Sequence, residues 1–231
     1  MLLQPMPVQV KVCGTTSISD ARLALEAGAD WLGVVALHPP SPRNTSLDVA
    51  RAIRDLAPTR MVLLTVNQSE ATLFALWEDI APAVLQLHGD ESPALVAALA
   101  RRGTRVWKAI HGDAAGLLVQ AQAFTDAGAD AILVDARATS DGETVYGGTG
   151  RVADWDGARA LVEAGFRVVL AGGLGPDNVA RAIAQVAPWA VDGVSKLEAS
   201  QGVKDADKVR DFVRAARLEV QSHQPANEHE A

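Results

Sequence analysis

The sequence has only one cysteine, Cys13, among its 231 residues, and this scarcity excludes several classes of protein. A single thiol cannot form an intramolecular disulfide, and it cannot contribute to a zinc site built from several cysteines. No run of 18 apolar residues occurs, so we expect no membrane-spanning helix and no membrane partner. The first ten residues lack the basic and long apolar regions of a signal peptide, which predicts a cytoplasmic protein.

Positive charge is also scarce, because 21 lysine and arginine residues face 28 aspartate and glutamate residues, for a net charge of -7. This balance argues against a nucleic-acid partner. It still allows a phosphorylated small molecule as substrate, since a local set of donors is enough to bind one phosphate. The sequence shows no Ser-His-Asp arrangement, no dinucleotide fingerprint and no cluster with metal-ligand spacing. We therefore expect neither a cofactor nor a metal ion.

Short apolar runs rich in β-branched residues alternate with amphipathic helical segments along the whole chain. Because these runs are continuously apolar, they predict parallel strands in a sheet that is covered on both faces. Strands are predicted at residues 8–13, 31–37, 61–66, 83–88, 105–110, 130–136, 167–172 and 190–195.

Helix boundaries are marked by capping residues between these strands. Ser17 or Ser19 and Asp177 are predicted as N-terminal caps, and the C-terminal stops are predicted at Gly28, Gly103, Gly128 and Gly165.

Eight strand–helix units in succession predict an α/β protein with a single-domain (β/α)8 TIM barrel, formed by residues 1–218. A doubly wound open sheet is the alternative, but the lack of a long linker or a change in composition favours a closed barrel. The polar and aperiodic residues 219–231 are predicted to be a disordered C-terminal tail.

Several polar residues lie at the ends of predicted strands, where barrels of this kind carry their chemistry. Cys13 ends the first strand, His88 the fourth and Asp135 the sixth. Each also has a structural interpretation. Cys13 could be a small buried core residue, His88 a hydrogen-bonding residue, and Asp135 a helix cap or an arginine partner.

Glycine-rich stretches follow the last three predicted strands, at residues 146–150, 171–178 and 193–200. Glycine lets backbone N–H groups approach an anion closely, and loops after the seventh and eighth strands are the usual phosphate site of this fold. The parts fit the isomerisation of a sugar phosphate, which needs proton transfers on an anchored substrate.

The motifs "KVCGTT", "SPR", "LQLHGDE", "LVDA", "GGTG", "LAGGLGPDNV" and "GVKD", in this order, resemble the phosphoribosylanthranilate isomerase family of tryptophan biosynthesis. The resemblance covers nearly the whole chain. It implies a cofactor-independent Amadori rearrangement of N-(5-phosphoribosyl)anthranilate, carried out by a monomer or homodimer. It also implies that Cys13 is the general base and that Asp135, initially protonated, is the general acid.

The remaining site residues are also implied by this resemblance. Nearby cations such as Lys11 or Arg43 are expected to lower the pKa of the Cys13 thiol. Contacts to the substrate are expected from Arg43, which would hold the anthranilate part, and from Lys11, His88 and Asp192. Phosphate contacts are expected from Gly148, Gly172, Gly173, Ser195 and Lys196.

Two positions depart from the family pattern. Ser17 stands where the family has arginine or asparagine, and Lys196 stands where a phosphate-loop glycine is expected. Lysine does not adopt a positive φ freely, so Lys196 could either donate to the phosphate or fill its site. These departures leave two alternatives open. The chain could isomerise another aminoaldose phosphate, or it could be a non-catalytic subunit that binds a phosphorylated ligand.

Overall fold

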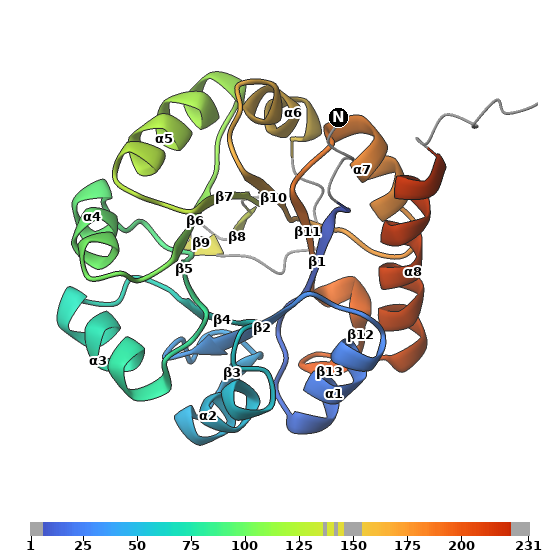
Figure 1. Ribbon diagram of the computed structural model, residues 1–231, viewed down its shortest axis with the longest axis horizontal. Helices are drawn as coiled ribbons and strands as arrows, with labels where there is room; N and C mark the ends of the chain where they lie inside the picture. The colour runs from blue at the N-terminus through green and yellow to red at the C-terminus, as the bar shows by residue number, and fades with distance from the viewer. Residues whose placement is uncertain (1–6, 136–137, 141–142, 146–153, 223–231) are drawn as a thin grey trace, which may run out of the picture.

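The computed structural model describes residues 7–135, 138–140, 143–145 and 154–222. Parallel strands form a central ring, and helices surround it on the outside (Figure 1). The barrel strands are β1 Gln9–Val12, β2 Trp31–Ala36, β4 Met61–Thr65, β5 Val84–Leu87, β6 Val106–Ile110, β7 Ala131–Val134, β10 Val168–Leu170 and β11 Ala190–Gly193. The helices are α1 Ile18–Glu26, α2 Leu47–Leu56, α3 Glu70–Ile80, α4 Pro93–Arg101, α5 Ala114–Asp126, α6 Trp155–Glu163, α7 Val179–Val186 and α8 Ala206–Ser222.

The strands close into a barrel, because β1 pairs with β2 on one side and with β11 on the other. This closure confirms the predicted (β/α)8 fold and excludes the open sheet. Every residue of β2 is buried, as expected for a strand covered on both faces. Within the described part of the chain, no helix has the length and hydropathy required to cross a membrane.

The predicted helix boundaries are mostly confirmed. The Ser17 side chain accepts a hydrogen bond from the Asp20 N–H at the start of α1. The predicted cap at Asp177 is wrong, because α7 begins one residue later with Asn178 at the cap position. Helix α8 continues to Ser222, so the first residues of the predicted tail are helical, and residues 223–231 lie outside the described residues. The four predicted stop glycines all have a positive φ: Gly28, Gly103, Gly128 and Gly165.

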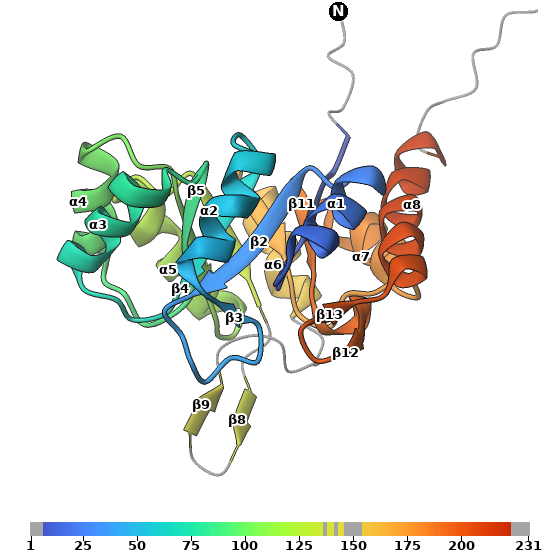
Figure 2. The ribbon, with the colours of Figure 1, turned by 90° about the horizontal axis from the view of Figure 1, so that it is seen from below.

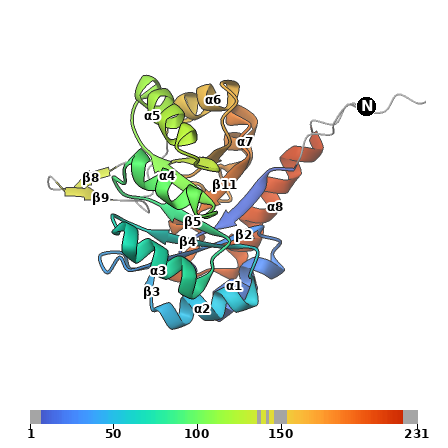
Figure 3. The same ribbon diagram turned by 60° about the vertical axis from the view of Figure 1, so that its left-hand side comes forward.

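Short strands outside the ring were not predicted. The pairs are β8 Ala138–Ser140 with β9 Glu143–Val145, and β12 Glu198–Ser200 with β13 Val203–Lys204, while β3 Asn44–Thr45 extends the sheet beside β2. These strands lie on the same side of the barrel, and the β8–β9 hairpin projects from it (Figures 2 and 3). They build the loop side of the barrel, where the strands end.

Three tryptophans fill the opposite end of the barrel. Trp31 and Trp107 pack edge to face with ring centroids 5.2 Å apart, and Trp107 and Trp189 do so at 5.5 Å. Because these large side chains close the end where the strands begin, the open end of the barrel lies where the strands finish.

Candidate active site

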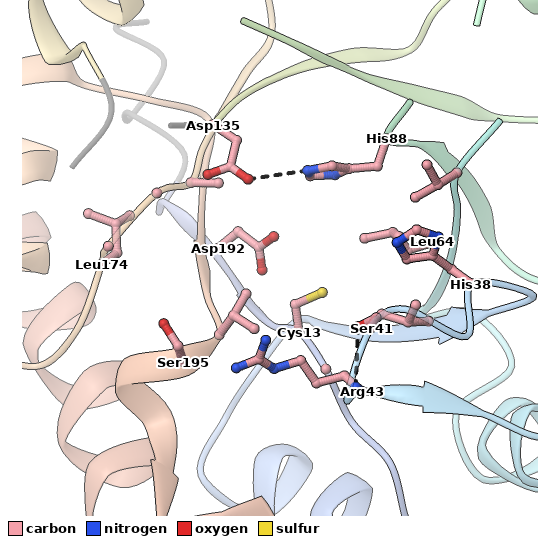
Figure 4. A pocket seen from close by; sticks show the side chains of 17 residues that line it. Cys13, His38, Ser41, Arg43, Leu64, His88, Asp135, Leu174, Asp192 and Ser195 are labelled. Atoms are coloured by element: carbon pink, nitrogen blue, oxygen red, sulfur yellow. Dashed lines mark hydrogen bonds and ion pairs between the residues drawn. The ribbon is translucent and has the colours of Figure 1, made fainter. Parts of the chain in front are cut away.

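A pocket opens at the carboxyl ends of the barrel strands (Figure 4). It receives side chains from loops that are far apart in the sequence, which explains why only the closed barrel assembles it. Eight of the predicted site residues line it: Cys13, Arg43, His88, Asp135, Gly172, Gly173, Asp192 and Ser195. Of the other three, Lys11 and Lys196 do not line the pocket, and Gly148 lies outside the described residues.

Cys13 directly follows β1, and its N–H donates to the Gly193 carbonyl at 2.9 Å. The thiol is buried and lines the pocket (Figure 4). Burial raises the pKa of Cys13 above its ordinary value, and the attraction of Lys11 opposes this rise without overcoming it. Lys11 thus lowers the Cys13 pKa as predicted, but the pKa is raised overall. Burial, which the sequence does not reveal at a strand end, outweighs the neighbouring cation.

Lys11 lies fully buried behind the thiol and pairs with Asp192, with 2.7 Å between Nζ and the carboxylate. Burial disfavours the ammonium, but attraction to Asp192 and Cys13 raises the Lys11 pKa overall. Burial also raises the pKa of Asp192 despite this pair. The Lys11 ammonium is thus shared by two buried acidic groups, Asp192 and Cys13. Additional negative charge in this cluster is therefore unfavourable.

Asp192 presents one oxygen to Lys11 and lines the pocket itself. Among the described residues, its other oxygen, Oδ1, is buried without a hydrogen-bond partner. A buried acceptor without a partner is costly, so this oxygen is suited to accept a hydroxyl from a bound molecule.

His88 follows β5 and connects to Asp135, which follows β7, at 3.2 Å between Nε2 and Oδ2 (Figure 4). On the other side of the ring, the Gln86 amide donates to His88 Nδ1 at 2.9 Å. With Nδ1 accepting, Nε2 carries the hydrogen and donates to Asp135. His88 therefore fixes the orientation of the carboxylate, and we find both interpretations of His88, structural and functional, compatible with this position.

Arg43 is engaged by a residue that was not predicted. Its Nε and Nη2 donate to the two carboxylate oxygens of Glu198 at 2.9 and 2.8 Å. Lys204 lies 3.4 Å from the same carboxylate and 3.3 Å from the Val194 carbonyl. Burial favours a higher Glu198 pKa, but the hydrogen bond and charge of Arg43 and the charge of Lys204 lower it overall. Burial lowers the pKa of Lys204, and attraction to Glu198 opposes it.

The loop after β10 forms a glycine-lined wall of the pocket. Gly172 and Gly173 have φ values of 84° and 63°, which glycine adopts without strain. The buried Asn178 side chain braces this loop, because it donates to the Gly173 carbonyl at 3.0 Å and accepts from the Gly175 N–H at 2.8 Å. This use of the side chain explains why Asn178 does not cap α7 with it.

Lys196 lies in the short 3-10 helix Ser195–Leu197 after β11. Its φ is not positive, so no glycine conformation is required here. The ammonium pairs with Asp177 at 3.2 Å, and the aliphatic part passes close to Gly175. The side chain therefore does not fill the pocket. Both departures from the family pattern have local explanations, since Ser17 is a helix cap.

The comparisons with known proteins agree on one family. Residues 10–215 match the family model for N-(5′phosphoribosyl)anthranilate (PRA) isomerase. The chain is 41% identical over 212 residues to N-(5′-phosphoribosyl)anthranilate isomerase of Trichlorobacter lovleyi, covering 91% of this chain and 98% of that relative. Phosphoribosyl anthranilate isomerase from Thermotoga maritima is similar in structure, with a TM-score of 0.79, 32% identity, and coverage of 91% and 99%. A solved complex of phosphoribosyl anthranilate isomerase with reduced 1-(o-carboxyphenylamino)-1-deoxyribulose 5-phosphate is similar at a TM-score of 0.74 and 32% identity, covering 91% of this chain and 99% of that one.

Proposed function

Because the chain belongs to the N-(5′-phosphoribosyl)anthranilate isomerase family, we propose that Cys13 is the general base and Asp135 the general acid in the pocket at the open end of its barrel. The enzyme is an isomerase of tryptophan biosynthesis. It carries out the Amadori rearrangement of N-(5-phosphoribosyl)anthranilate to 1-(2-carboxyphenylamino)-1-deoxyribulose 5-phosphate. The observation that carries the assignment is that the Cys13 thiol, just after β1, and the Asp135 carboxyl group, just after β7, face the same pocket (Figure 4).

The first step opens the sugar ring. Asp135, in its protonated form, gives its proton to the furanose ring oxygen, and the bond from that oxygen to C1′ breaks. The nitrogen lone pair forms a Schiff base with C1′. The 3.2 Å contact with His88 holds the Asp135 side chain in one orientation, so that it can be aimed at one substrate oxygen.

The second step needs the thiolate of Cys13. It removes the proton from C2′, and the C–H electrons form an enolamine with C1′. The enolamine then becomes the ketose, as C1′ gains a proton and the C2′ hydroxyl loses one. Burial raises the pKa of Cys13 and so disfavours the thiolate, and the attraction of Lys11 opposes this rise.

The ends of the substrate bind on either side of these groups. Arg43 holds the anthranilate part, and Asp192 accepts a sugar hydroxyl through its unpartnered oxygen. The phosphate binds to the backbone N–H groups of the loops after β10 and β11, at Gly172, Gly173 and Ser195, with Lys196 nearby. The positive φ of both loop glycines supports this, because such backbone turns its N–H groups toward a common point.

The test combines genetics with kinetics. The gene should restore growth without tryptophan to a strain that lacks its own isomerase, and the Cys13→Ala and Asp135→Asn genes should not. In vitro, each variant should lower kcat by roughly 10²- to 10⁴-fold, the contribution of one positioned acid or base, with an unchanged thermal unfolding curve. Failure of the unmodified gene to restore growth, together with no turnover, would reject the proposed substrate.

No observation favours another aminoaldose phosphate or a non-catalytic role, because Ser17 and Lys196 both have structural explanations. The proposal also includes a cytoplasmic location, where an ionic phosphorylated substrate is retained, and a monomeric or homodimeric state. Cell fractionation and sedimentation measure these two properties.

A further inference from the structure

Three sequence motifs that are far apart in the chain meet at Arg43, which lines the pocket. Arg43 comes from the Ser-Pro-Arg loop, residues 41–43, Glu198 begins β12, and Lys204 ends β13 in the "GVKD" motif. Glu198 receives two hydrogen bonds from Arg43, at 2.9 and 2.8 Å, and Lys204 lies 3.4 Å from it. The "GVKD" motif has no part in the proposed proton transfers, so its function requires a separate explanation.

The β12–β13 hairpin is built to hold this contact. Glu198 and Lys204 are direct cross-strand partners in its register. The turn contains Gly202 at a φ of 79°, where a Cβ atom would lie 2.9 Å from the Pro42 carbonyl oxygen. The Thr16 hydroxyl donates to the Gly202 carbonyl at 2.5 Å. The hairpin thus lies directly against the loop that carries Arg43.

The charges of these three residues do not cancel. One carboxylate faces one guanidinium and one ammonium, which leaves one positive charge in a buried cluster. Lys204 donates to a carbonyl and a carboxylate, as a protonated amine does. Without Lys204, Arg43 and Glu198 would form a neutral pair that attracts an anion only weakly.

Arg43 retains donors for a ligand. Glu198 occupies Nε and one N–H of Nη2, and within the described part of the chain no hydrogen bond engages Nη1. The guanidinium lines the pocket near Cys13 and Ser195 (Figure 4). The remaining edge can receive a second carboxylate side by side, the geometry for which guanidinium is suited.

We propose that Glu198 and Lys204 make Arg43 a specific receptor for the carboxylate on the aromatic ring of the substrate. Glu198 is a positioning residue that fixes the plane of the guanidinium, and Lys204 supplies the charge that Glu198 would otherwise neutralise. The inference rests on the proposed function, because it takes the anthranilate carboxylate as the group that Arg43 binds.

Two stable ligands separate recognition of the carboxylate from binding of the rest of the molecule. One is reduced 1-(o-carboxyphenylamino)-1-deoxyribulose 5-phosphate, and the other is the same compound without the carboxylate. Their Kd values would be measured by titration calorimetry at pH 7 for the wild type, Lys204→Met and Lys204→Arg. The control is Lys208→Met, which removes the same charge from a half-exposed ammonium whose contacts, among the residues that the structure describes, are the Glu198 main-chain carbonyl and Asp205.

We expect Lys204→Met to weaken the carboxylate ligand by roughly tenfold or more, the size of one charge-assisted contact, and the other ligand by less than about twofold. Lys204→Arg should keep the preference for the carboxylate, and Lys208→Met should leave both Kd values within about twofold. Equal losses for both ligands in Lys204→Met, or no loss for either, would overturn the inference. A Lys204→Arg variant that loses the preference would overturn it as well, even if the methionine variant does not fold.

Turnover of N-(5-phosphoribosyl)anthranilate by the wild type tests the proposed function separately. A wild type that turns over this substrate, combined with unselective losses in Lys204→Met, rejects only the role of the cluster. A wild type without turnover rejects the function.

Discussion

A Cβ atom added to Gly33 would lie 2.5 Å from Sγ of Cys13 and 2.9 Å from its Cα. Gly33 lies in β2, the strand next to β1, and all of its neighbours in that strand are buried. No real Cβ atom is found this close to a sulfur or a backbone atom, so glycine at position 33 provides the space in which the thiol sits.

Gly33→Ala should therefore displace Cys13 from its position in the pocket. We expect kcat to fall by about 10²-fold, since a shift of about 1 Å in a reacting group has an effect of that order. Steady-state kinetics measure kcat, and thermal unfolding shows whether the variant is folded. Gly116→Ala, in the first turn of α5 and outside the pocket lining, is the matched control and should keep full activity. Normal kcat in a folded Gly33→Ala enzyme would show that the thiol position is not critical.

The pKa of Cys13 gives a second prediction. Burial raises it and Lys11 opposes the rise, so the rate of alkylation by iodoacetamide should reach half its maximum at a pH above the ordinary thiol value. Replacing Lys11 by methionine removes the opposing cation and should move the midpoint higher still. Because Cys13 is the only thiol of the chain, mass spectrometry measures alkylation at this one residue, and Cys13→Ala is the negative control. A midpoint below the ordinary value would mean that the cations dominate, as the sequence alone predicted.

The barrel was predictable because its signals are local. All eight ring strands were located to within about two residues, since a β-branched apolar run and a following cap each act over a few residues. The β12–β13 hairpin was missed because its strands are only three and two residues long. The strands are joined by the ion pair of the cross-strand partners Glu198 and Lys204. Periodicity cannot reveal strands of this length.

The candidate site was predictable in its positions but not in its energetics. Cys13, His88 and Asp135 were predicted because each lies at the carboxyl end of a strand, and the barrel brings these ends together on one side. Glu198 was missed, since its pairing with Arg43 joins residues 155 positions apart. The direction of the Cys13 pKa was missed because burial depends on the packed barrel. A motif such as "GVKD" could have directed attention to Lys204, but only as a charge without a partner.

The Arg43–Glu198 pair predicts how stability depends on pH. The pKa of Glu198 is lowered in the folded state, so its charge stabilises the protein above the ordinary glutamate pKa, and this stabilisation is lost as the pH falls toward the lowered value. Glu198→Gln should cost roughly 3–5 kcal/mol at pH 7, because it leaves a buried guanidinium without its charge partner. The difference from wild type should shrink as the pH falls below about 4, the region of the ordinary glutamate pKa.

Urea unfolding of both proteins across this range measures the difference. Glu163→Gln is the control, because its ion pair with Arg159 is exposed on α6 and should contribute little at any pH. A Glu198→Gln deficit that is equally large at low and neutral pH would indicate lost packing rather than lost charge.

Lys196 and Asp177 provide the last prediction, because they hold each other at 3.2 Å beside the proposed phosphate site. If the ammonium of Lys196 donates to the substrate phosphate, Asp177 competes for it. Lys196→Met should then raise KM several-fold, the loss expected for one partly exposed charge contact, while Asp177→Asn should lower KM by releasing the ammonium. Neither change should alter kcat, since neither side chain lines the pocket that holds Cys13 and Asp135. The opposite signs distinguish donation from a structural role, in which breaking the pair from either side would raise KM alike.

Lys196→Gly adds a further comparison. Because the φ of Lys196 is not positive, glycine gains nothing from its conformational freedom here, and its KM should match that of Lys196→Met. Steady-state assays of the three variants, followed by the fluorescence of the anthranilate substrate at low and high salt, measure these effects. A gain in kcat/KM for Lys196→Gly would show that the lysine restricts the site rather than serving it.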